Sequence, residues 1–156
     1  MPAATPSGYL SLAYNYLRES LAASATWQAM CSVNNAAAAK AYIHIGDADA
    51  ETLTRPFCIL CGGKDNVRRT ASDYMHHSGS AKMVLEFVPG GTPAELWACN
   101  QAGALVSEIG ALSGQPGYLD ASSIEIEQEP TPSEPSEGES TLYYQLVLNV
   151  TWGEES

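Results

Sequence analysis

Basic residues are missing from the second part of this 156-residue chain. All seven Lys and Arg residues lie at or before position 82, together with six acidic residues, whereas twelve acidic residues follow. The formal net charge is −11. Surfaces that bind DNA need clustered basic side chains that displace counterions from the phosphates. This distribution of charge therefore argues against a conventional nucleic-acid-binding protein.

The chain also lacks a long apolar run. None approaches the roughly 18 residues that a membrane-spanning helix requires. The opening residues, MPAATPSG, contain neither the basic nor the apolar stretch of a secretory signal. We therefore expect no membrane partner and a protein that works in the cytoplasm where it is made.

The composition is that of a globular protein. Hydrophobic residues make up 45% of the chain and charged residues only 16%, whereas disordered chains carry far fewer apolar groups. A chain of this length builds one core and not two. We predict a single domain over residues 1–156, with a structured core over residues 8–152.

Motifs that specify a reaction are also missing. The GGK triplet lacks the spacing of a phosphate-binding loop, and no Ser, Asp and His grouping surrounds a nucleophile elbow. We therefore predict that the protein is not an enzyme and needs no cofactor.

The strongest chemical motif is CILCGG, in which Cys58 and Cys61 have the spacing of half a zinc site. A structural zinc site usually needs a second such half. The remaining thiols and imidazoles are scattered, and they are Cys31, Cys99, His44, His76 and His77. Residues three apart on a strand point to opposite faces, so we favour core thiols. The alternative is a small zinc or redox enzyme that uses Cys58 and Cys61 with His76 or His77.

Two segments have the pattern of long helices. Over residues 8–23, apolar residues recur at one helical face, and they are Leu10, Tyr14, Leu17 and Leu21. Ser24 and Asn35 are placed to cap two short helices that follow. In the second long helix, TPAE offers Thr92 as the N-cap, Pro93 at the first helical position and Glu95 as the capping-box partner. Its apolar stripe consists of Ala98, Ala102, Leu105, Ile109 and Leu112, and Gly114 ends it.

The remaining segments alternate as strands do. We predict strands over residues 41–45, 55–61, 67–74, 82–88, 122–128 and 141–152, with a hairpin around the turn-rich HHSGS. The last strand alternates most fully and places six apolar residues on one face, from Leu142 to Trp152. The order of these elements predicts an α+β fold, with two long helices packed on one side of a mostly antiparallel sheet.

Residues 129–140 are acidic and rich in Pro and Ser. They contain no large apolar group that could offset the entropy of ordering, so we predict a long hairpin loop. Candidate contact residues for a neighbouring subunit or a pore are Glu134, Glu137 and Glu139 in this loop, together with Arg68 and Arg69 on a predicted strand.

Four stretches within residues 8–152 carry a family resemblance. They are YLRESLAASATWQAM, AYIHIG, RPFCILCGG and YYQLVLNVTWG. In their order along the chain and their residue pattern they resemble the tail terminator, or tail completion, family of tailed bacteriophages. The members of this family are head–tail joining proteins of the neck.

This resemblance implies an α/β subunit that forms a homohexameric ring, caps the tail tube, stops its polymerisation and docks to the head connector. It implies a virion protein assembled in the host cytoplasm, with the tail tube and connector proteins as partners. DNA would pass through the ring without specific binding, and Glu134, Glu137 and Glu139 would lie at the bore or a ring face. The alternatives are another neck or tail subunit, such as a head–tail adaptor or tube protein, and a cytoplasmic protein-binding module.

Overall fold

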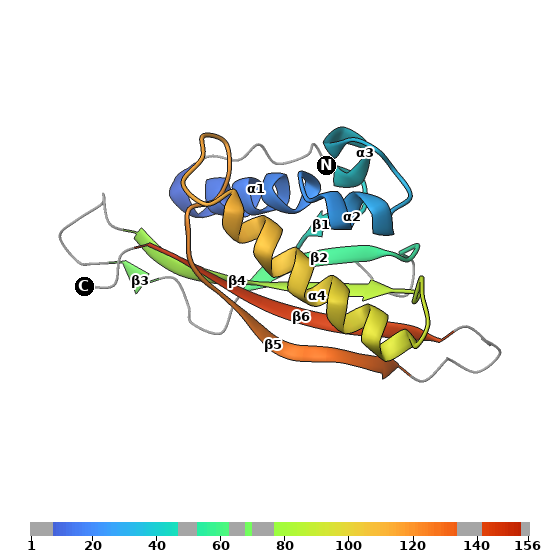
Figure 1. Cartoon of the computed structure of the whole chain (residues 1–156). Coiled ribbons are helices and arrows are strands. Elements are labelled where there is room, and N and C mark those ends of the chain that lie inside the picture. The colour runs from blue at the N-terminus through green and yellow to red at the C-terminus, as the bar shows by residue number, and fades with distance from the viewer. Residues whose placement is uncertain (1–7, 47–52, 63–67, 70–76, 134–141, 154–156) are drawn as a thin grey trace.

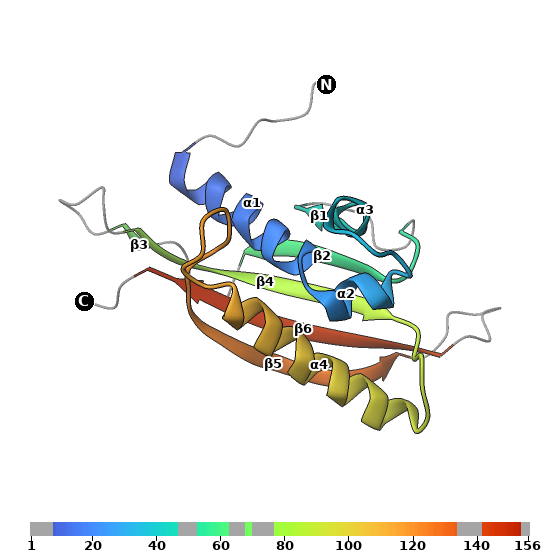
Figure 2. The same ribbon diagram turned by 45° about the horizontal axis from the view of Figure 1, so that its top comes forward.

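The computed structural model describes residues 8–46, 53–62, 68–69, 77–133 and 142–153 (Figure 1). These residues form a mixed α+β fold in which a mostly antiparallel sheet is covered by helices on one face. Figure 2, turned by 45°, shows the two long helices on that same face. The predicted fold class is confirmed at this level. None of the described helices is long and apolar enough to cross a bilayer.

Two of the three helices for which the sequence predicts an N-cap begin at the predicted residue. The described helices are α1 (Gly8–Ala22), α2 (Ala25–Met30), α3 (Ala36–Lys40) and α4 (Ala94–Ala111). The Ser24 hydroxyl accepts a hydrogen bond from the Trp27 amide at 3.2 Å, and the Asn35 side chain accepts one from Ala38 at 2.8 Å. Both predicted caps are confirmed.

The exception is the start of α4. Pro93 keeps an extended conformation and itself occupies the N-cap position, without a side-chain cap, so the prediction that Thr92 is the N-cap is wrong. The turn before it is held by packing, because Gly90 and Gly91 lie directly against the indole of Trp97. The helix begins at Ala94, one residue later than the capping pattern predicts.

The described strands are β1 (Ile43–Ile45), β2 (Phe57–Gly62), β3 (Arg68–Arg69), β4 (His77–Phe87), β5 (Ala121–Ser133) and β6 (Tyr143–Trp152). Five of them lie in the order β1-β2-β4-β6-β5, and β3 pairs with the start of β4. Only the β1–β2 pair is parallel. The strands β1 and β5 are therefore the two edges.

Two strand boundaries differ from the prediction. Residues 77–80 of the HHSGS motif are strand and not turn, since β4 begins at His77, where it pairs with β3, and pairs with β6 from Gly79. His76 lies outside the described residues. Residues 129–133, predicted as loop, belong to β5, whose Thr131 pairs with Gln145 and Ser133 with Tyr143. Proline is tolerated in β5 because an edge strand needs ladder hydrogen bonds on one side only. The rest of the predicted loop, residues 134–140, lies outside the described residues.

The core lies between the helices and the sheet. The predicted stripe of α4 is buried at Ala98, Ala102, Leu105 and Ile109, while Leu112 is half-buried at the C-cap. The predicted face of β6 is buried from Tyr144 to Trp152, with Leu142 as the exposed exception. On α1, Leu17 and Leu21 are fully buried.

Candidate assembly surfaces

The residues singled out in the sequence fall in different places. Arg68 and Arg69 form β3, which pairs with Ser78 and His77 at the beginning of β4. Glu134, Glu137 and Glu139 lie outside the described residues. The sequence-predicted contact residues are therefore represented in the described structure by β3 alone.

The cysteine motif lies on a regular strand. Cys58 pairs with Leu85 and belongs to the core cluster, whereas Cys61 pairs with Lys82 on the other face of the sheet. The prediction that they face opposite sides is confirmed. Burial, followed by the neighbouring Cys61 and Cys31, raises the pKa of the Cys58 thiol well above its ordinary value. The thiolate, which is the form that binds metal or attacks disulfides, is therefore disfavoured at Cys58.

No described part of the chain brings together three or more His, Cys, Asp or Glu side chains in a position to hold a metal ion. His44 is half-buried on β1. His76 lies outside the described residues. Burial raises the pKa of Cys31 to about 12, and Cys99 is exposed.

Exposed apolar side chains gather where β4 ends, α4 begins and β6 begins (Figure 1). Val88 follows β4 and is 46% exposed, Leu96 lies in the first turn of α4 and is 58% exposed, and Leu142 precedes β6 and is 42% exposed. The register of β4 on β6 places Phe87 opposite Tyr144, so Val88 and Leu142 lie at the same end of the sheet. Grouped exposed apolar side chains are typical of contact surfaces.

Acidic side chains accompany this apolar group. Glu95 lies beside Leu96 in the first turn of α4, and Glu129 lies on β5 near its last residue. Both are exposed, and neither forms an ion pair with another described residue. We call Val88, Glu95, Leu96, Glu129 and Leu142 the acidic end.

Arg55 lies at the centre of a cluster of two aromatic rings and one carboxylate close to the acidic end. The guanidinium of Arg55 stacks over the Tyr143 ring at 3.7 Å and lies 6.0 Å from the centre of the Phe57 ring. Its Nη2 lies 3.4 Å from the Glu86 carboxylate. Arg55 thus ties the segment before β2 to the strands β4 and β6. Sequence reasoning missed this cluster because its members are far apart in the chain and no local pattern joins them.

The opposite end of the molecule carries β3 and the beginning of α1 (Figures 1 and 2). Leu12 and Tyr16, one turn apart on α1, are 36% and 38% exposed. The exposed Asp120, directly before β5, also lies at this end of the sheet, because Ala121 pairs with Trp152 and Trp152 pairs with Gly79.

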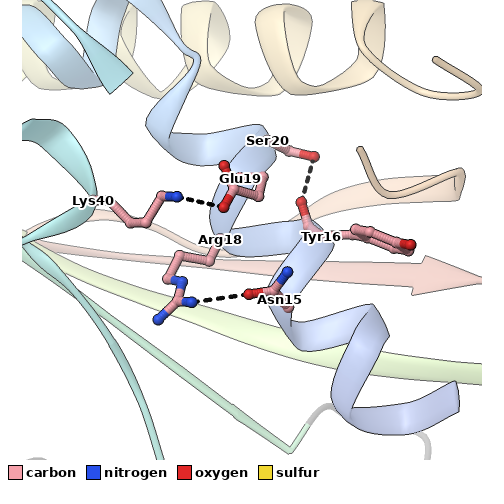
Figure 3. A network of polar contacts seen from close by, with 6 residues as sticks. All are labelled: Asn15, Tyr16, Arg18, Glu19, Ser20 and Lys40. Carbon is pink, nitrogen blue, oxygen red and sulfur yellow. Dashed lines mark hydrogen bonds and ion pairs between the residues drawn. The ribbon is translucent and has the colours of Figure 1, made fainter. Parts of the chain in front are cut away.

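Figure 3 shows polar contacts of α1, two within the helix and one with Lys40 of α3. Lys40 on α3 lies 2.5 Å from the Glu19 carboxylate, and Arg18 donates to the Asn15 side chain at 2.8 Å. The buried hydroxyl of Ser20 donates to the Tyr16 carbonyl at 2.9 Å and accepts from the Leu119 amide at 3.2 Å. The contacts of Glu19 with Lys40 and of Ser20 with Leu119 join α1 to α3 and to the segment before β5.

The sheet face opposite the helices is polar along its centre. Lys82 on β4 reaches Glu127 on β5 at 3.3 Å across β6, and the Gln128 amide donates to the Gln145 side chain at 3.2 Å. No described helix lies on this face (Figure 2). On this face the Lys82–Glu127 pair lies beside the exposed Glu125, because Asn149 of β6 pairs with both Lys82 and Glu125.

In comparisons with known proteins, no protein family and no curated protein matches this sequence.

Proposed function

We propose that this chain is a structural subunit of the neck of tailed bacteriophages, a tail terminator that forms a ring, caps the tail tube and joins it to the head connector. The observation that carries the proposal is the gathering of Val88, Leu96 and Leu142, all more than 40% exposed, at one end of the sheet. A subunit of a permanent assembly needs such surfaces, because apolar contact drives its association.

The order of elements is compatible with the same proposal. The four stretches that carry the resemblance to tail terminators fall on α1 with α2, on β1, on β2 and on β6. The acidic balance of the chain is compatible with a ring around DNA, since a basic bore would hold the duplex through many phosphate contacts. Glu134, Glu137 and Glu139 remain the residues that we propose for the bore or a ring face.

Electron microscopy of the purified protein in negative stain tests this proposal. We expect single closed rings with a central opening, hexameric as in the family that the chain resembles. Long tubes would instead assign the chain to the tube proteins of the same class. Dispersed single subunits at every concentration would contradict the proposal.

A further inference from the structure

We propose that the outer face of α4 binds the same face of a second copy, so that two copies pair about a two-fold axis with their α4 helices antiparallel. The partner to which this inference commits is a second copy of this chain. It goes beyond the proposed function, because this contact joins two subunits and does not build a ring.

The outer face of α4 consists of exposed residues spaced three or four apart along the helix. They are Leu96, Cys99, Asn100, Gly103, Ser107 and Gly110. The buried stripe of α4 lies on the opposite side of the helix, against the sheet. No described helix or strand covers the outer face in Figure 1 or Figure 2. This face is therefore open to another molecule.

The outer face carries no charged side chain. The charged residues of α4 are Glu95, at the rim beside Leu96, and Glu108, which turns away to accept hydrogen bonds from Ser24 and Thr26. The exposed side of a surface helix ordinarily carries charged groups. A chain of net charge −11 repels its own copies. An uncharged face lets two copies meet without bringing like charges into contact.

Among the described residues, no neighbour requires the two glycines of the outer face. A Cβ atom at Gly103 would meet nothing within 4 Å, and one at Gly110 would reach only ordinary contact with Ile124 at 3.9 Å. Glycine within a helix is less stable than alanine, so each glycine weakens the single subunit. Close approach of a second helix accounts for both, because the side chains at a helix contact set the distance between the two axes.

The spacing of the outer face selects a second copy of α4 as the partner. Gly103 lies at the middle of the helix, and Leu96 and Gly110 each lie about 10 Å along the axis from it. When two antiparallel α4 helices cross at Gly103, Leu96 of each copy faces Gly110 of the other. The Leu96 side chain, 58% exposed in the single subunit, then fills the space that Gly110 leaves open. A face that matches itself in this way forms an isologous, two-fold contact.

Leu96 also relates this dimer to the proposed ring. Leu96 belongs both to the outer face of α4 and to the acidic end, so one subunit uses it in only one of the two contacts at a time. The two-fold dimer is therefore a form of the free subunit that ring formation replaces. The dimer itself does not depend on the proposed function.

One introduced cysteine tests the antiparallel pairing. In this arrangement Ser107 of one copy faces Cys99 of the other, because both lie one turn from Gly103 on opposite sides. We expect Ser107→Cys to form disulfide-linked dimers through Cys99 under mild oxidation, with the linkage identified by peptide mass spectrometry. The two positions lie about 12 Å apart along one helix, too far for a disulfide within one copy. The matched control is Ala37→Cys, at an exposed position of α3, which should link no more than wild type.

Sedimentation velocity measures the dimer without a crosslink. We expect Gly103→Gln to raise the dissociation constant of the dimer about tenfold or more, because a long side chain at the crossing point holds the helices apart. The subunit should tolerate this change, since a Cβ at Gly103 has open space. Ala37→Gln is the control and should leave the dissociation constant unchanged. Circular dichroism establishes that each variant is folded.

The possible outcomes separate this inference from the proposed function. A dissociation constant unchanged by Gly103→Gln, or linkage of Ser107→Cys no greater than that of Ala37→Cys, would overturn the inference. Efficient linkage of wild type through its two Cys99 thiols would indicate a parallel pairing and would overturn it as well. Rings that form without a dimer would overturn the inference and leave the proposed function standing. Dimers that never form rings would support the inference and remove the proposed function.

Discussion

Glu108 shows how one side chain of α4 organises a helix other than its own. Its carboxylate accepts hydrogen bonds from the Thr26 amide at 3.0 Å, the Thr26 hydroxyl and the Ser24 hydroxyl at 3.3 Å. Burial alone would raise the pKa of Glu108, but the hydrogen bonds from Thr26 and Ser24 outweigh burial and lower it. The carboxylate is therefore a tertiary cap for the first turn of α2.

Replacing Glu108 by Gln removes the charge and keeps the size. We expect Glu108→Gln to lower the free energy of unfolding by about 1 kcal/mol at neutral pH, as loss of a helix cap does. The folded-state pKa is depressed, so the contribution is complete above the unfolded pKa and is lost as pH falls through the folded value. In urea titrations, the difference from wild type should shrink between about pH 5 and pH 3. A difference that stays constant over this range would contradict the role of the charge.

Arg55 should stabilise the fold through its contacts with Tyr143 and Glu86. We expect Arg55→Ala to lower the free energy of unfolding by about 2 kcal/mol, because it removes the stack on Tyr143 and leaves the largely buried Glu86 without its cation. Lys82→Ala is the matched control, since the more exposed pair with Glu127 should contribute less than about 1 kcal/mol. If the two variants lose the same free energy of unfolding, Arg55 does not stabilise the acidic end in particular.

At the scale of elements, two glycines of the α4 region should respond in opposite directions to the same change. A methyl group at Gly91 would lie 2.5 Å from Cδ1 of Trp97, whose ring is held edge-on against Phe87 at 5.8 Å, whereas Gly103 within α4 has open space. We expect Gly91→Ala to lower the free energy of unfolding by about 1–3 kcal/mol. Gly103→Ala should raise it by about 0.5–1 kcal/mol, since Gly is a poor helix former. Thermal unfolding of both variants measures this, and stabilisation by Gly91→Ala would refute the packing of the turn on Trp97.

The elements that could be predicted from the sequence are those with local causes. The caps at Ser24 and Asn35 and the buried stripe of α4 depend on residues three or four positions apart, so the sequence alone reveals them. The extent of β5 could not be predicted in this way. Its last residues are held by pairing with β6, and nothing in the local composition of residues 129–133 indicates a strand.

The same distinction between local and long-range causes applies to the candidate site. Arg68 and Arg69 stand out in the sequence as a pair of like charges, and the structure places them at the start of β4. The acidic end was not predicted as a surface, because its members come from four segments that only the sheet and the turn before α4 bring together. The strand prediction for residues 141–152 even assigned Leu142 to the buried face, yet it is exposed.

At the scale of the whole molecule, the charge asymmetry of the sequence does not become a simple spatial one. Arg55 lies against Tyr143 near the acidic end, whereas the exposed Asp120 lies at the opposite end of the sheet, where Trp152 pairs with Gly79 and Ala121. Exposed apolar side chains accompany both ends. The exposed apolar side chains of the acidic end are the surface that we propose for contact with another subunit.

Native mass spectrometry of the wild-type protein over a range of concentrations tests this account most directly, because one spectrum reports both subunit number and bound metal. The account predicts a closed, metal-free oligomer, hexameric if the resemblance to tail terminators holds. A monomer at every concentration that carries one zinc ion per chain would contradict it and would favour an enzyme built on Cys58 and Cys61.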